Sequence, residues 1–181
     1  MAEVQMQKIS EVAGDRLKWA QPSALRRHFE LKRSEELIAQ LQFRSVFGTL
    51  ATAESGDGCW TFKRVGFWQQ KVTVRADGSE DDLAVFRNNT WKNGGTLEFP
   101  NGRRFPATTN FWSTKFAFEN DAGETLVRFH YGGVFRLSAD VEILQPARTM
   151  AELPILVLFG WYLAVMLHMD SGAAAAAAAA G

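Results

Sequence analysis

The segment from residue 153 to residue 169, LPILVLFGWYLAVMLHM, contains no permanently charged side chain and constrains the fold more than any other part of the chain. As a helix it has no polar face, so something apolar must surround it on all sides. Burying about twelve large side chains, at ~1.5–3 kcal/mol each, stabilises by roughly 20–35 kcal/mol. Water is therefore excluded as its environment, which leaves protein or lipid.

A lipid bilayer is the first candidate environment, and the segment is short for it. Its seventeen residues rise about 25 Å as a helix, whereas a hydrocarbon core of ~30 Å needs about 20 residues. Glu152 and Asp170 bound the segment, and Pro154 and Gly160 interrupt its apolar run. Arg148 is the nearest basic residue, so the cationic flank of a membrane anchor is weak. The segment is a borderline membrane span and a good buried helix.

The rest of the chain alternates apolar and polar residues with a period of two, which is typical of half-buried antiparallel strands. The longest such run is FRLSADVEI, whose apolar residues share one face: Phe135, Leu137, Ala139, Val141 and Ile143. Between the runs lie glycine-rich turn signals, and Asn101-Gly102 has the composition of a type I′ hairpin turn. Candidate strands start near residues 16, 28, 37, 46, 58, 67, 71, 83, 96, 103, 114, 124 and 134.

These features predict an all-β fold, a closed antiparallel barrel of about 12 strands around the hydrophobic C-terminal helix. A sheet of a dozen strands curls and closes, and the resulting barrel is wider than its own side chains can fill. A helix about 10 Å across fits in such a lumen. We expect Pro154 in the first turn of the helix, and we expect Gly160 to mark a close approach between helix and wall.

Length and composition bound the organisation of the chain. One domain is expected over residues 16–170, including the central helix 153–169, with a flexible lead over 1–15 and a low-complexity alanine tail over 171–181. Twenty basic and twenty acidic residues cancel, so no net field draws the chain to nucleic acid. The single Cys59 cannot form an internal disulfide, and residues 1–10 contain no secretory signal. We therefore expect a cytoplasmic protein.

Several short motifs occur in a characteristic order. An LKW-x-x-P opening from Leu17 to Pro22 precedes FELK (29–32), WTFKR (60–64), VTVR (72–75), LEF-x-NGR (97–103) and the apolar helix. In this order, over roughly residues 16–170, the chain resembles the tubby C-terminal domain and its relatives, the phospholipid scramblases and the LURP-one-related proteins. The resemblance implies a closed twelve-stranded barrel around a hydrophobic helix. For function it implies phosphoinositide binding by basic surface residues, although the bacterial and plant members have no defined activity.

The basic residues Lys63, Arg64, Lys71 and Arg75 lie close together on two adjacent predicted strands. Several cations on neighbouring strands can bind the phosphate of an anionic headgroup through charge-assisted hydrogen bonds. The alternative interpretation is a solvated outer face, balanced by acidic residues nearby in the sequence. The chain's net neutrality favours this second interpretation.

Other clusters give weaker indications. The carboxylates of residues 77–82 lack the ligand order of an EF-hand, and the three histidines have no metal-ligand spacing. Cys59 has no partner or nucleophile signature, and the chain contains no G-x-S-x-G or phosphate-binding loop motif. The tryptophans favour barrel core over nucleic-acid stacking, because no basic excess accompanies them. We expect no catalytic residue, no metal and no cofactor.

Two functions remain open at this point. The first is a non-catalytic tubby-like binding module for a phosphoinositide, another anionic lipid or a protein partner, cytoplasmic or peripheral at a membrane. The second is a membrane-anchored, scramblase-like protein that uses helix 153–169 as a membrane segment.

Overall fold

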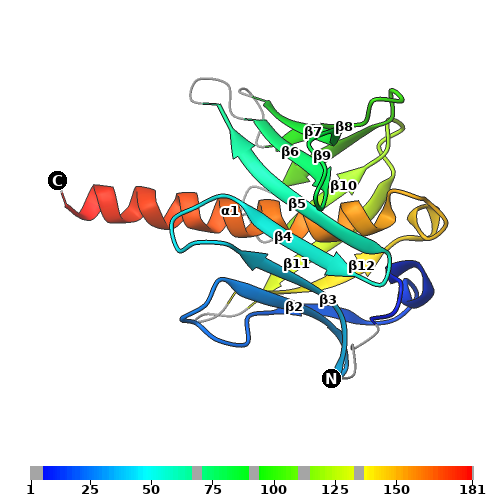
Figure 1. Cartoon of the computed structure of the whole chain (residues 1–181), viewed down its shortest axis with the longest axis horizontal. Helices are drawn as coiled ribbons and strands as arrows, with labels where there is room; N and C mark the ends of the chain where they lie inside the picture. Colours follow the sequence, from blue (N-terminus) through cyan, green and yellow to red (C-terminus); the bar gives the residue numbers. More distant parts are fainter. Residues whose placement is uncertain (1–5, 67–70, 90–93, 110–114, 133–136, 181) are drawn as a thin grey trace.

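The computed structural model describes residues 6–66, 71–89, 94–109, 115–132 and 137–180. It is a closed barrel of twelve antiparallel strands around one long helix (Figure 1). Every strand pairs with its neighbours in sequence, and β1 pairs with β12 to close the barrel. The fold predicted from the sequence is confirmed.

The elements follow one another with short connections. The strands are β1 (Leu17–Ala20), β2 (His28–Arg33), β3 (Glu36–Phe43), β4 (Ala51–Ser55), β5 (Gly58–Val65), β6 (Lys71–Ala76), β7 (Asp82–Asn89), β8 (Gly94–Glu98), β9 (Arg104–Thr109), β10 (Lys115–Glu119), β11 (Thr125–Gly132) and β12 (Ser138–Ile143). The helices are η1 (Ile9–Val12), η2 (Gln145–Ala147) and α1 (Leu153–Ala179).

Period-two alternation places the apolar residues on the inner face of the barrel. In β12, Ala139, Val141 and Ile143 are buried, as the pattern predicts, while Asp140 and Glu142 are exposed. Phe135 lies outside the described residues, as do Trp68, Trp91 and Trp112. The wall therefore presents one dry face to the lumen and one wet face to solvent.

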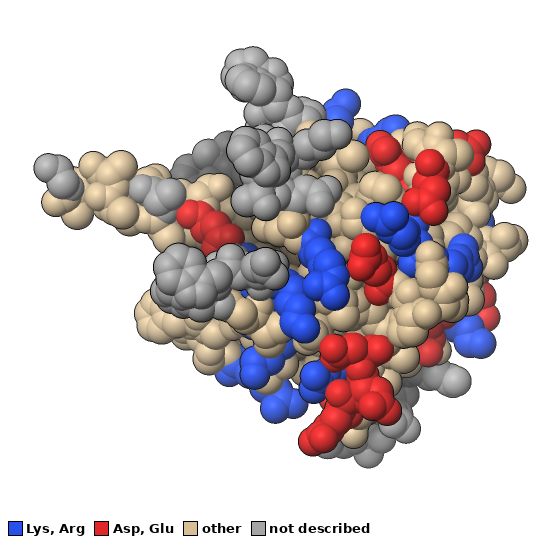
Figure 2. Space-filling view, turned by 90° about the horizontal axis from the view of Figure 1, so that it is seen from above, with Lys and Arg blue, Asp and Glu red and all other residues tan. Residues whose placement is uncertain are grey.

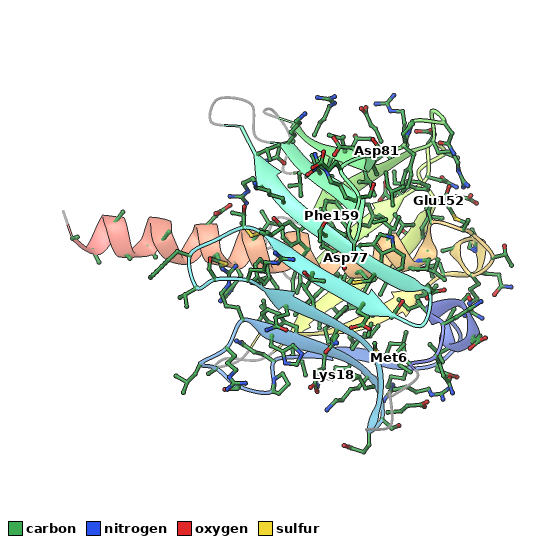
Figure 3. The ribbon with its side chains drawn as sticks, in the orientation of Figure 1. Met6, Lys18, Asp77, Asp81, Glu152 and Phe159 are labelled. Atoms are coloured by element: carbon green, nitrogen blue, oxygen red, sulfur yellow. The ribbon has the colours of Figure 1, made fainter. Side chains whose placement is uncertain are left out.

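Helix α1 fills the lumen. Every residue from Leu153 to Met166 is buried, and Figure 3 shows Phe159 inside the ring of strands. Aromatic rings of the wall pack on the helix: Trp161 stacks on Trp19 at 5.6 Å between ring centroids. By length and composition α1 could cross a membrane, but 78% of its most apolar window is buried inside the protein. In this structure the wall of the barrel is the apolar surrounding that the helix requires.

Gly160 confirms the predicted close approach between helix and wall. A Cβ atom at this position would lie 2.5 Å from two ring atoms of Phe129 and 3.2 Å from the ring of Phe118. Because real Cβ contacts are longer, only glycine lets α1 sit this close to β10 and β11.

Three local expectations need correction. Residues 6–15 do not form a flexible lead, because Ile9 and Val12 are fully buried and the Ile9 amide donates to Asp57 at 2.8 Å. The strand expected near residue 46 begins only at Ala51. Asn101-Gly102 is not a type I′ turn: Gly102 has positive φ but Asn101 does not, because Pro100 fixes a different turn, closed by the Gly102 amide on the Phe99 carbonyl at 3.0 Å.

Helix α1 is also longer than the expected segment. It continues past Met169 through the alanine run to Ala179, and its residues beyond Met166 emerge from the barrel (Figure 1). Alanine has the highest helix propensity, and a helix that is already formed extends without a new nucleation cost.

Candidate functional site

The barrel has two ends that differ in sequence and in packing. We call the end where α1 begins the entry end; it carries the connections that follow even-numbered strands. We call the end where α1 emerges the exit end; it carries the connections that follow odd-numbered strands. Of the exit-end connections, residues 21–27 and 44–50 are fully described.

The structure places the four basic residues predicted as a site on two faces of the wall. Cross-strand pairing puts Lys63 opposite Thr73 and Arg64 opposite Val72, so these neighbouring residues of β5 point to opposite sides. Lys63, Lys71 and Arg75 share the outer face, whereas Arg64 points toward the lumen at the exit end. The four do not form one cluster.

Arg64 holds the helix where it leaves the barrel. Its Nη1 and Nη2 donate to the two carboxylate oxygens of Asp170 at 3.2 and 2.9 Å. A bidentate guanidinium–carboxylate pair fixes orientation as well as distance. Beside it, the Tyr162 hydroxyl donates to the Thr49 carbonyl at 2.7 Å, and burial raises the pKa of Tyr162 to about 12.

On the outer face, Arg75 already has a partner, because its Nε lies 2.6 Å from Asp82. Lys71 lies opposite Arg87 on β7, which in turn pairs with Glu98 at 3.3 Å. Lys63 is exposed and diagonal to Lys71 across the β5–β6 pair, about 7–8 Å away in Cα position. Lys63, Lys71 and Arg75 stay close together on one surface, where the ion pair with Asp82 holds Arg75.

Arg27 organises the exit end and was not singled out from the sequence. Its Nη1 donates to the carbonyl oxygens of Ser45, Val46 and Gly48 at 2.9, 2.9 and 2.8 Å. Its Nη2 lies 2.7 Å from the Met169 sulfur, and its guanidinium sits 3.8 Å from the centre of the Phe43 ring. Burial lowers the pKa of Arg27. One side chain thus ties two connections to the emerging helix.

Two exit-end arginines remain available to a ligand. Arg26 and Arg44 are exposed, and neither forms an ion pair with the residues that the structure describes. With Arg27 they give the two described exit-end connections three cations and no carboxylate. In the sequence, the other four segments that follow odd-numbered strands contain no Asp or Glu either.

The entry end has the opposite charge. Its connections and leads (6–16, 34–35, 56–57, 77–81, 99–103, 120–124 and 144–152) carry ten acidic residues against four basic ones. The acidic residues are Glu11, Asp15, Glu35, Asp57, Asp77, Glu80, Asp81, Asp121, Glu124 and Glu152. Figure 2 shows one side of the barrel. Most of the Asp and Glu residues visible there lie away from the projecting helix, and several Lys and Arg residues lie nearer to the base of the helix. The neutral chain is therefore polarised along the barrel axis.

Packing at the entry end is closed. Glu152, at the start of α1, is 7% exposed and pairs with Arg103 at 2.6 Å (Figure 3 labels Glu152). A carboxylate at a helix N-terminus is favourable because it faces the positive end of the helix dipole. The segment around η1 is fixed by Asp57 and by the Arg33–Asp15 ion pair at 2.9 Å.

The other grooves and titratable groups offer less support for a functional site. An open groove of about 540 Å³ beside β12 is lined by groups of both signs, including Arg16, His130 and Asp140. Burial raises the pKa of the half-buried Cys59 thiol, which makes it a poor nucleophile. Within the described parts of the chain, no three His, Cys, Asp or Glu side chains are arranged to hold a metal ion.

A comparison with known proteins finds no matching family model, no matching curated protein and no matching solved structure.

Proposed function

We propose that this protein is a non-catalytic, tubby-like binding module that recognises anionic lipid headgroups at a membrane surface through the exit end of its barrel. The observation that carries the proposal is the segregation of charge between the two ends. The described exit-end connections hold Arg26, Arg27 and Arg44 without a carboxylate, while the entry-end segments hold ten acidic residues against four basic ones.

Net neutrality argues against long-range attraction but not against binding by one end. The Debye length at physiological salt is about 8 Å, so charges at the far end of the barrel are screened from a surface that touches the near end. Each Lys or Arg close to an anionic bilayer contributes about 1 kcal/mol. Arg26 and Arg44 supply this attraction directly, and the exposed Lys63 adds to it from the wall.

Family membership is part of the proposal. A closed twelve-stranded barrel around a buried C-terminal helix is consistent with the tubby-like fold. The motif order from Leu17 to Arg103 supports the same relationship. If it holds, a cytoplasmic protein that associates peripherally with membranes is the expected cellular setting, and a protein partner at the same end is the competing possibility.

The membrane-anchored, scramblase-like function has weaker support. Its proposed membrane segment, 153–169, would have to leave a lumen in which Leu153 to Met166 are all buried. Removing it would expose the inner wall of the barrel to water, at about 25 cal/mol for each Å² of apolar surface. We therefore keep α1 inside the barrel in the proposed function.

The test is co-sedimentation with vesicles in the absence of detergent. We expect no binding to phosphatidylcholine, and binding when phosphatidylserine or a phosphoinositide is included. Binding should fall steeply between 50 and 300 mM salt, because the interaction is electrostatic. Equal binding to neutral and anionic vesicles, or none to either, would refute the proposal; a preference for phosphoinositide over phosphatidylserine at equal charge would assign a specific headgroup.

A further inference from the structure

Large apolar side chains in contact with solvent gather at the exit end. Among the residues that the structure describes, five large hydrophobic side chains are exposed: Leu25 (94%), Val46 (65%), Phe47 (94%), Leu83 (38%) and Leu167 (48%). Leu25 lies in the β1–β2 connection, Val46 and Phe47 lie in the β3–β4 connection, and Leu167 is where α1 emerges. Four of the five thus surround the same opening.

The loop that carries Val46 and Phe47 is held in this conformation by hydrogen bonds. Arg27 draws the carbonyl oxygens of Ser45, Val46 and Gly48 inward at 2.8–2.9 Å. The Gly48 amide donates to the Ser45 hydroxyl at 2.8 Å, which closes the tip of the loop. With the backbone oxygens turned toward Arg27, the apolar side chains at the tip face solvent. Their exposure is fixed by the loop's own bonding.

The emerging part of α1 continues this apolar surface. From Leu167 to Ala179 the helix is thirteen residues long, about 20 Å. Asp170 is its one permanently charged residue, and the bidentate pair with Arg64 compensates that charge at the base of the projection. From Gly172 to Ala179 the helix carries only glycine and alanine, without a charged side chain.

We propose that the exit end inserts into one leaflet of an anionic bilayer, with the barrel axis along the membrane normal. In this arrangement, which rests on the proposed function, Leu25, Val46 and Phe47 enter the boundary between headgroups and acyl chains. Arg26 and Arg44 stay at the level of the phosphates. The alanine-rich end of α1 enters the same leaflet as a short rod, and the entry end faces the aqueous phase.

The shape of this surface favours a bilayer over a protein partner. Figure 1 shows α1 projecting along the barrel axis beyond the described β1–β2 and β3–β4 connections. A protein that covered Leu25 and Phe47 together would need a deep hole for the helix, whereas a fluid acyl layer adapts to any such projection. Cations beside apolar side chains also match the order in which a surface approaching a bilayer meets phosphates and then acyl chains.

Insertion can be measured with an environment-sensitive fluorophore on a single cysteine. In a Cys59→Ser background, the probe is attached at Phe47→Cys, and as a matched control at Asp121→Cys in the β10–β11 turn of the entry end. On anionic vesicles we expect a blue shift and quenching by spin-labelled lipid at position 47 and neither at position 121. A probe at position 47 that stays in water while the protein binds would overturn the insertion and leave headgroup binding intact.

A second pair of variants separates insertion from attraction. Leu25→Ser/Phe47→Ser should bind anionic vesicles at least tenfold more weakly than the parent at both 50 and 300 mM salt, because the apolar contribution to binding is not screened by salt. Leu83→Ser, the exposed leucine elsewhere on the barrel, should match the parent at both salts. A double variant that binds as tightly as the parent at both salt concentrations would overturn the insertion. Failure of the parent to bind any anionic vesicle would instead overturn the proposed function on which it rests.

Discussion

The same twelve strands form both ends of the barrel, yet the two ends differ in charge, in hydrogen bonding and in the exposure of apolar side chains. The entry end is acidic and tightly bonded: Glu152 and Arg103 pair beside the start of α1, and Asp57 fixes the η1 segment. The exit end is basic and has apolar side chains exposed to solvent, and Arg27 bonds its β3–β4 connection and contacts Met169 of the emerging helix. One end is organised to be stable in water, whereas the other presents cations and apolar tips outward.

The same contrast runs along α1. Its first fourteen residues, Leu153 to Met166, are buried, and from Leu167 onward the helix is largely exposed. The helix has no polar face in either part, so its surroundings alone decide which part contributes to stability. Breaking the inner part should unfold the barrel, and changing the outer part should leave the fold intact.

The largest expected effect is that of Leu158→Asp. Leu158 is fully buried, so the substitution places an unpaired carboxylate in the lumen, at a cost of several kcal/mol even after its pKa rises. A domain of this size has about 5–15 kcal/mol of total stability, so the variant should be largely unfolded in circular dichroism and denaturant titration. Leu167→Asp at the exit should melt within a few degrees of the parent. A soluble Leu158→Asp protein with the parent's melting temperature would contradict the central helix.

Tyr162 is fully buried in the lumen and should make stability depend on alkaline pH. Its pKa is raised from 10.0 to about 12 by burial, so folding favours the neutral phenol. The corresponding contribution, about 2–3 kcal/mol, is fully present below pH 10 and lost as the pH rises through 12. Denaturant titrations at pH 9 and 11 should show a smaller loss for Tyr162→Phe than for the parent. Equal losses would place Tyr162 in contact with water.

Two glycine-to-alanine substitutions, one in the buried part of α1 and one in the exposed part, each add a single methyl group and so compare the packing of the two parts. Gly160→Ala brings a Cβ within 2.5 Å of Phe129, and overpacking of about 1–3 kcal/mol should exceed the gain of up to ~1 kcal/mol in helix propensity. Gly172→Ala has no atom within 4 Å to meet and should stabilise slightly. The measurement is the denaturant midpoint of both variants, and a stabilising Gly160→Ala would mean that the wall yields more easily than the structure indicates.

Most of the architecture could be predicted from the sequence, because it follows from strong periodic patterns. The alternation of β12 predicts one dry and one wet face, and the all-apolar run from Leu153 requires an apolar surrounding. A closed barrel with a filled lumen satisfies both. Gly160 was predictable for the same reason, since a glycine inside a core helix usually marks a close contact. The start of β4 was missed because Val46 and Phe47 resemble strand residues, and only the bonding of their carbonyls to Arg27 reveals an exposed loop.

The candidate site was harder to predict, because the relevant charge pattern is spread over the whole chain. Sequence proximity grouped Lys63, Arg64, Lys71 and Arg75, but alternation sends Arg64 to the opposite face, where it pairs with Asp170. The difference in charge between the two ends could in principle have been predicted. Once the strand order is known, the absence of Asp and Glu from every segment after an odd-numbered strand can be read from the sequence. Net charge conceals this pattern because it averages the two ends.

The most direct test of an oriented, exit-end contact with the membrane reverses the charge of two basic residues at each end of the barrel. Arg26→Glu/Arg44→Glu changes the exit end, and Lys8→Glu/Arg16→Glu makes an identical change in net charge at the entry end, with all four residues exposed. On phosphatidylserine vesicles at 100 mM salt, the exit-end variant should bind at least a hundredfold more weakly than the parent, since each reversal removes about 1 kcal/mol of attraction and adds repulsion. The entry-end variant should bind within about threefold of the parent. Equal loss in both variants would show that net charge governs binding and would contradict an oriented, exit-end contact with the membrane.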